Sequence, residues 1–246
     1  LGYYDPNVFY NTSRFEGDII RHPLVNFLEL IGISLKFLFT QSNDTFGIYH
    51  ATSDRSVLWP NGELVYHIDY SLYPHQFLIK SAMDHISSRT GNCIKFKKRT
   101  FETAYVYVYS NQGCYSAIGR QGDAQELSLG QGCHVMGVVI HEFLHALGFY
   151  HYHSRSDRDQ YLRINYQNII PSMMSQFQML SPFQNQIFTD FDYESIMIYG
   201  STAFSRDGRS PTMVPLKAGV YLRDPGYKYS LTEKDVISIK KLYGCA

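Results

Sequence analysis

The pattern H-E-x-x-H-x-x-G-x-x-H, which begins at His141, restricts this chain more than any other feature of its sequence. An α-helix turns by about 100° per residue, so His141 and His145 lie one turn apart on the same helical face. Neutral imidazoles suit Zn²⁺, which in catalytic sites takes three protein ligands and keeps one position open for water. Glu142 is placed to accept a proton from that water, and Gly148 allows the left-handed turn that brings His151 to the same ion. The pattern therefore predicts a hydrolytic zinc site. The alternative is an amphipathic helix with surface histidines, but all five specified positions of the motif would then have to match by chance.

Length, charge and hydropathy indicate a globular protein and argue against nucleic-acid binding and a membrane span. The 246 residues have room for one large domain or two small ones with a sizeable core. Lys plus Arg and Asp plus Glu both number 22, so no net field favours nucleic acid or an acidic membrane surface. The most apolar run, residues 24–39, contains Glu29 and Lys36 and is shorter than the ~20 apolar residues that a membrane-spanning helix needs. We therefore expect no nucleic-acid partner and no transmembrane segment.

The cysteines indicate an oxidising compartment. Four are present, at Cys93, Cys114, Cys133 and Cys245, with no C-x-x-C pair, and three pairings are possible. Because the histidines already supply a metal site, two disulfides of a secreted protein are the better interpretation than a second metal site. The N-x-S/T sequons at Asn11 and Asn43 are compatible with extracellular glycosylation.

The order of hydrophobic patterns predicts two lobes with a cleft between them. Alternating patterns predict strands at 64–68, 93–96, 104–109 and 126–129, and helical spacing predicts helices at 76–89 and 135–147. After His151 the sequence becomes rich in loops. A capping box of Ser230 and Glu233 predicts the start of a terminal helix that runs through Leu242.

Motifs beyond the histidine pattern resemble the astacin family of metzincin zinc metalloendopeptidases, roughly over residues 51–245. The run from His151 extends as H-Y-H-S-R-S-D-R-D, and the Met-turn of the family is matched by S-I-M-I-Y-G at 195–200. Further matches are W-P-N-G at 59–62, G-C-Y-S at 113–116, I-G-R at 118–120, Q-E-L-S-L-G at 125–130, G-C at 132–133, F-S-R-D-G at 204–208 and P-T at 211–212.

The resemblance implies an α+β fold, a two-lobed metzincin-like catalytic domain. Its N-terminal lobe would hold a twisted, mostly parallel sheet and two helices, and its C-terminal lobe would be irregular with one terminal helix. It selects one disulfide pairing, Cys93 with Cys245 and Cys114 with Cys133.

The resemblance also assigns roles at the zinc site and in substrate binding. Met197 would form the hydrophobic floor under the zinc, and Tyr199 would be a weak extra ligand that stabilises the oxyanion during catalysis. The strand that holds Cys114, Tyr115 and Ser116 would pair with extended substrate. Arg223 would select acidic residues after the scissile bond, although the match there is partial, because Leu222 replaces the family's Gln and residues 224–229 look inserted.

A second motif implies latency. F-E-G-D at residues 15–18 resembles the F-x-G-D motif of astacin pro-segments, whose Asp, here Asp18, binds the zinc and blocks the water position. Without the family, the Gly-Asp pair is simply a turn. We therefore expect residues 1–50 to be an inhibitory pro-segment, with an apolar stretch at 24–40 that has no counterpart, and residues 51–246 to be the peptidase domain.

Three positions depart from the family pattern. Tyr152 replaces the usual Glu after the third histidine, Ile198 replaces the usual His of the Met-turn, and His50 stands where an Arg usually precedes the mature domain. The expected function is a secreted zinc endopeptidase that acts on extracellular proteins or peptides after an activating protease removes the pro-segment. The alternatives are a catalytically impaired zinc-containing extracellular binding module and a structural disulfide-stapled domain.

Overall fold

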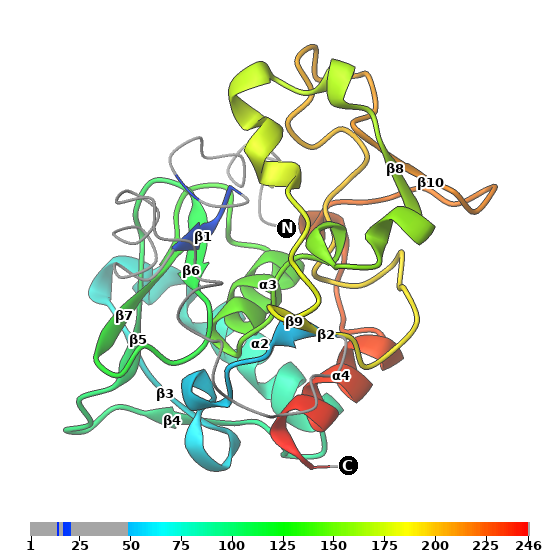
Figure 1. The fold of residues 1–246 in the computed structure, drawn as a ribbon. Helices are drawn as coiled ribbons and strands as arrows, with labels where there is room; N and C mark the ends of the chain where they lie inside the picture. Colours follow the sequence, from blue (N-terminus) through cyan, green and yellow to red (C-terminus); the bar gives the residue numbers. More distant parts are fainter. Residues whose placement is uncertain (1–13, 15–16, 21–48, 246) are drawn as a thin grey trace, which may run out of the picture.

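The computed structural model describes residues 14, 17–20 and 49–245 (Figure 1). The predicted glycosylation sites Asn11 and Asn43 and the apolar stretch 24–40 lie outside these residues. Within the described part of the chain, no helix is long and apolar enough to cross a membrane.

The described residues contain a six-stranded sheet, two small two-stranded sheets and three α-helices. The strands of the large sheet are β1 (Ile19–Ile20), β3 (Glu63–Ile68), β4 (Lys95–Lys98), β5 (Tyr105–Tyr109), β6 (Cys114–Ala117) and β7 (Ala124–Leu129). The small sheets pair β2 (Tyr49–Thr52) with β9 (Asn185–Gln186), and β8 (Leu162–Ile164) with β10 (Met213–Pro215). The helices are α2 (Gln76–Arg89), α3 (Met136–Ala146) and α4 (Glu233–Tyr243).

The large sheet is mostly parallel, in the order β1-β6-β7-β5-β3-β4, and only the β6–β7 pair is antiparallel. Alternation along β5 explains its two faces, because Val106 and Val108 are buried while the three tyrosines that alternate with them are half-buried. The buried face packs with α2 and α3 in one core. The expected α+β class is confirmed, as are the predicted helices that correspond to α2 and α3.

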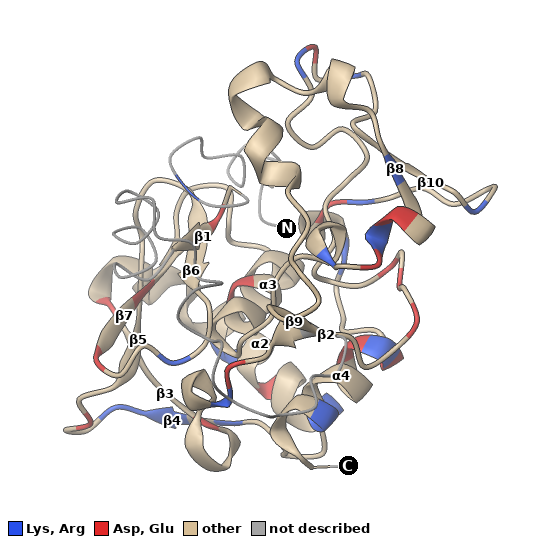
Figure 2. Cartoon of the chain, in the orientation of Figure 1, with Lys and Arg blue, Asp and Glu red and all other residues tan. Residues whose placement is uncertain are grey.

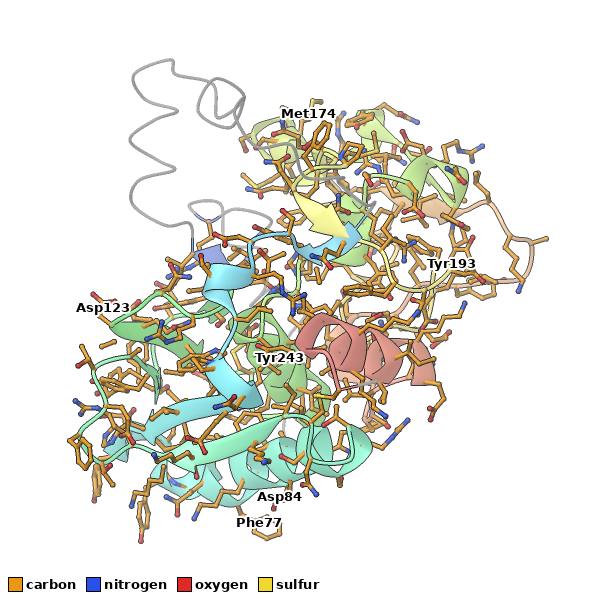
Figure 3. The ribbon with its side chains drawn as sticks, turned by 60° about the horizontal axis from the view of Figure 1, so that its bottom comes forward. Phe77, Asp84, Asp123, Met174, Tyr193 and Tyr243 are labelled. Atoms are coloured by element: carbon orange, nitrogen blue, oxygen red, sulfur yellow. A yellow bond between two sulfur atoms is a disulfide. The ribbon has the colours of Figure 1, made fainter. Side chains whose placement is uncertain are left out.

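Helix α3 lies inside the molecule, whereas α2 covers it from outside. Every residue of α3 from Gly137 to Ala146 is buried, including the polar residues of the zinc motif, so the helix is enclosed on all sides. Helix α2 has one buried stripe, and its exposed residues Phe77 and Asp84 point away from the protein at the edge of Figure 3. The zinc motif is therefore carried by the most enclosed helix of the fold.

Residues 95–99 have the basic sequence K-F-K-K-R, and the first four of them form the edge strand β4, which is mostly blue in Figure 2. Lys97 pairs with Glu102 at 2.9 Å and with Glu63 at 3.7 Å. Charged side chains on an edge strand hinder pairing with other chains. This run is explained by its place at the sheet edge and does not require an anionic partner.

The predicted start of the terminal helix is wrong by two residues. Helix α4 begins after Thr232, whose hydroxyl accepts from the backbone N–H of Asp235 at 3.0 Å, while the Asp235 carboxylate accepts from the N–H of Thr232 at 3.0 Å. The predicted capping residues Ser230 and Glu233 instead accept hydrogen bonds from Arg89 of α2. The capping box therefore lies two residues later than predicted, because Ser230 and Glu233 are engaged by Arg89.

Two disulfides close loops of very different length. Cys93 is bonded to Cys245, and Cys114 is bonded to Cys133. In the chain-entropy model, their sequence separations of 152 and 19 residues correspond to about 5 and about 3 kcal/mol of stabilisation. Tyr243 of α4, labelled in Figure 3, also donates its hydroxyl to the Leu147 carbonyl at 3.1 Å, which joins the C-terminal helix to the end of α3.

Candidate metal centre and active site

Three imidazoles and one carboxylate converge at the end of α3. His141 and His145 belong to the helix, and Gly148, with a φ of 102°, lets the chain turn back to His151. The Nε2 atom of His141 lies 3.1 Å from that of His145 and 3.1 Å from that of His151. Asp18 completes the cluster, with carboxylate oxygens 3.2 to 3.4 Å from the three Nε2 atoms. All four side chains are fully buried.

The donors and their spacing fit zinc. His141 Nδ1–H donates to the Ile196 carbonyl at 2.8 Å, and His145 Nδ1–H donates to the Phe149 carbonyl at 2.7 Å. These carbonyls assign the proton to Nδ1, so Nε2 carries the lone pair in both neutral rings. Lone pairs that face one another repel unless a cation lies between them. Tetrahedral zinc, with bonds of about 2.0–2.1 Å, places its ligand atoms about 3.3 Å apart, which matches this cluster.

Burial and local charges keep these groups in the protonation states that a metal needs. Burial lowers the pKa of His141 to about 3, because an imidazolium is costly without water. Burial raises the pKa of the Asp18 carboxyl, but the three imidazoles that surround it outweigh burial, and its pKa lies well below its usual value. His141 is therefore a neutral ligand and Asp18 an ionised one.

Glu142 is a buried carboxylate that has no hydrogen-bond partner among the described residues. Its side chain is fully buried, and neither carboxylate oxygen accepts a bond. Burial raises its pKa well above the usual value, the negative charge of Asp18 raises it further, and Arg14 lowers it. Native proteins rarely leave such a group unpaired, because desolvation without a bond costs about 1–3 kcal/mol or more. The side chain is suited to a ligand or water that is not part of the protein.

The Met-turn at 195–200 lies against His141 and His151. Met197 is buried, and its carbonyl accepts from the N–H of Tyr152 at 2.9 Å. The buried ring of Tyr199 lies beside His151, with ring centroids 4.3 Å apart, and 6.1 Å from the ring of His141. The turn thus supplies a wall of the site and, through the Ile196 carbonyl, a hydrogen-bond acceptor for His141.

The segment around Asp18 is held by both halves of the protein. Strand β1 lies parallel to β6, with Ile19 opposite Ser116, and the Ser116 N–H donates to the Asp18 carbonyl at 2.9 Å (Figure 1). The Arg14 guanidinium lies 3.2 Å from the ring centroid of Tyr115, and the Arg14 carbonyl accepts from the Gln176 side chain at 2.9 Å. Sequence reasoning did not identify Arg14 or Gln176, because a contact across 162 residues has no local signal.

The residues expected to bind substrate lie in two different environments, one buried in the large sheet and one at the surface. Cys114, Tyr115 and Ser116 are buried in β6, and the edge of β6 that faces away from β7 is paired with β1. The Arg223 side chain is about half exposed, and its guanidinium pairs with Glu194 at 2.6 Å. The structure therefore joins β6 to the Asp18 segment, while Arg223 has an acidic partner of its own.

Two of the residues that depart from the family pattern, Tyr152 and Ile198, are buried side chains. Tyr152 is fully buried, with the Arg155 guanidinium 4.9 Å from its ring centroid and the Phe191 ring 5.5 Å away. Burial raises the pKa of its hydroxyl, so this side chain is neutral. Ile198 is also fully buried. Neither residue places a charge next to the metal cluster.

A family model and two curated relatives agree on the family to which this chain is similar. The family model for astacin, which describes a family of peptidases, matches residues 51–244. The chain is 39% identical over 237 residues to zinc metalloproteinase nas-6 of Caenorhabditis elegans, covering 96% of this chain and 64% of that protein. It is 38% identical over 230 residues to astacin-like metalloprotease toxin 1 of Loxosceles intermedia, covering 91% of this chain and 84% of the toxin. The chain thus spans slightly less than two thirds of the nematode protein.

A solved structure supports the same relation. High choriolytic enzyme 1, a hatching enzyme zinc-protease from Oryzias latipes (medaka fish), superposes with a TM-score of 0.73 at 36% sequence identity. The match covers 80% of this chain and 100% of the enzyme chain. The fold that carries the metal cluster is therefore that of a zinc-protease family.

Proposed function

The chain belongs to the astacin family of peptidases, and from this premise we propose that it is a zinc-dependent endopeptidase of extracellular proteins or peptides. One observation carries the proposal. The fully buried carboxylate of Glu142, which has no hydrogen-bond partner among the described residues, follows the first of three buried histidines whose Nε2 atoms face one another. Two disulfides are compatible with a secreted protein.

Different residues of the chain carry out metal binding, proton transfer and stabilisation of the oxyanion. His141, His145 and His151 would hold the zinc ion, which would supply a bound water with a pKa lowered toward about 7 and a Lewis acid for the scissile carbonyl. Glu142 takes the proton from the attacking water and delivers it to the leaving amine, for which its raised pKa is suitable. The Tyr199 hydroxyl donates to the oxyanion of the tetrahedral intermediate, a kind of contact that is worth about 3 kcal/mol.

The proposal includes latency of the uncleaved chain. Asp18 faces the three histidines and would be a further ligand of a bound zinc, in place of water, and β1 is paired with the edge of β6 on which an extended substrate would pair. Arg14 adds contacts to Tyr115 and Gln176. Residues 1–50 would thus be the pro-segment and 51–246 the peptidase domain. Because Tyr152 offers no carboxylate to a new N-terminus, activity should tolerate ragged trimming around residues 50–54.

The mechanism is tested by Glu142→Ala in the chain from which residues 1–50 have been removed. Since Glu142 is the base and not a ligand, the variant should keep one zinc per chain and lose peptide cleavage. Metal content by atomic emission and cleavage of a quenched fluorescent peptide are measured on the same samples, with wild type and wild type plus chelator as references. Wild-type cleavage by this variant would refute the mechanism. An inactive wild type that holds stoichiometric zinc would favour the impaired binding module instead.

A further inference from the structure

A buried lysine lies beneath the Met-turn. Lys228 is only 5% exposed, and its Nζ donates to the carbonyls of Ser195 at 2.7 Å and Ile198 at 3.0 Å. Burying an ammonium group costs several kcal/mol unless it is well compensated. The acceptors here are backbone carbonyls on either side of Ile196, so the compensation comes from the turn itself.

Two carboxylates hold the same turn. Asp224 accepts from the N–H of Gly200 at 2.7 Å, at the end of the turn. Asp235 accepts from the Ser195 hydroxyl at 2.5 Å and from the Ile196 N–H at 3.1 Å, at its beginning. Both carboxylates also act favourably on the Lys228 charge, although burial still lowers the pKa of this lysine to about 8. Ile196 is thus bounded by charge-assisted hydrogen bonds on both sides.

The segment that provides Lys228 also packs on the zinc helix. The carbonyls of Pro225 and Lys228 approach Gly137, the second residue of α3, so closely that a Cβ there would lie 2.1 and 2.2 Å from them. No side chain larger than hydrogen fits. Residues 224–228 therefore contact both the helix that carries His141 and the turn whose Ile196 carbonyl orients His141.

We propose that Lys228 is a positioning residue of the metal centre. By holding the carbonyls of Ser195 and Ile198, it fixes the Ile196 carbonyl that accepts from His141 Nδ1–H and so directs His141 Nε2 toward the zinc. The residues that look inserted in the sequence after Arg223 thereby become a support for the metal site. This inference rests on the proposed zinc peptidase function.

The test is Lys228→Met in the full chain, because methionine keeps an unbranched stem and lacks the amine. Groups that orient a metal ligand typically contribute 10- to 100-fold to metal affinity, and we expect about tenfold weaker zinc binding in a chelator competition. The d–d absorption bands of the cobalt(II)-substituted variant should shift, since one imidazole is less well oriented. Lys228→Arg, which keeps charge and donors, should recover part of the affinity.

Matched controls separate positioning from general stability. Lys80→Met removes an exposed lysine of α2 and should leave zinc affinity unchanged. Ile86→Ala leaves a cavity beside the fully buried face of α2 and should lower stability at a place away from the turn. An equal loss of zinc affinity in Ile86→Ala and Lys228→Met, at equal loss of stability, would overturn the proposal. Zinc affinity of Lys228→Met within twofold of wild type would overturn it as well.

A second variant keeps the proposal testable if Lys228→Met does not fold. Asp224→Asn retains the shape of the side chain that accepts from Gly200 and removes its charge. It should also weaken zinc binding, by a smaller factor than Lys228→Met. Unchanged zinc affinity in this variant would contradict the inference. Failure of the wild-type chain to bind zinc at all would instead refute the proposed function, whatever Lys228 does.

Discussion

Asp18→Asn should activate the uncleaved chain. The substitution keeps the shape of the side chain, the β1 pairing and the backbone bond to Ser116, and removes only the charge that faces three imidazoles. Loss of one partner of a fully buried charged contact typically costs about 3–5 kcal/mol. At about 1.4 kcal/mol per factor of ten, the lower figure predicts roughly a 10²-fold larger population in which the pro-segment has left the metal.

The assay is cleavage of a quenched fluorescent peptide by uncleaved wild type and uncleaved Asp18→Asn at equal zinc content. Intact mass spectrometry before and after the assay confirms that residues 1–50 are still attached. Arg14→Ala serves as a graded comparison, because a stacked guanidinium contributes about 1 kcal/mol and its loss should raise activity only several-fold. Equal, low activity of wild type and Asp18→Asn, with full activity after trimming, would show that occlusion by the segment rather than metal capture causes latency.

Three further predictions concern turnover, specificity and pH. Tyr199→Phe in the trimmed enzyme should lower kcat by about 10²-fold with zinc retained, as for one lost oxyanion donor, and an unchanged kcat would remove Tyr199 from catalysis. Cleavage of a peptide library should show acidic residues after the scissile bond, and this enrichment should fall in Arg223→Ala; a profile without Asp or Glu there would show that Arg223, which pairs with Glu194, does not select the substrate. Lys228 has a pKa of about 8 in the folded chain and about 10.4 when unfolded, so above pH 8 the unfolded state binds more protons and stability rises with pH. From pH 7.5 to 9 the unfolding free energy of wild type should therefore increase by about 1 kcal/mol relative to Lys228→Met, measured by urea denaturation, and parallel pH profiles of the two would contradict the burial of this charge.

The local part of the site follows directly from the order of residues. His141, Glu142 and His145 are spaced by a helical turn, and helical periodicity depends only on neighbours along the chain. The same reasoning located α2 and the strand that became β5, because their apolar residues recur with the period of one element. It left three disulfide pairings possible, and only the family resemblance chose among them.

The folded chain decided the contacts that join distant segments. Two equally spaced capping pairs overlap the start of α4. Arg89 of α2 donates hydrogen bonds to Ser230 and Glu233, and Thr232 and Asp235 cap the helix. A lysine is expected at the surface from its residue type alone, yet Lys228 is buried because the turn at 195–200 presents carbonyls to it. Burial and electrostatic compensation are properties of the assembled core, and a one-dimensional pattern carries no measure of which chain segments will meet there.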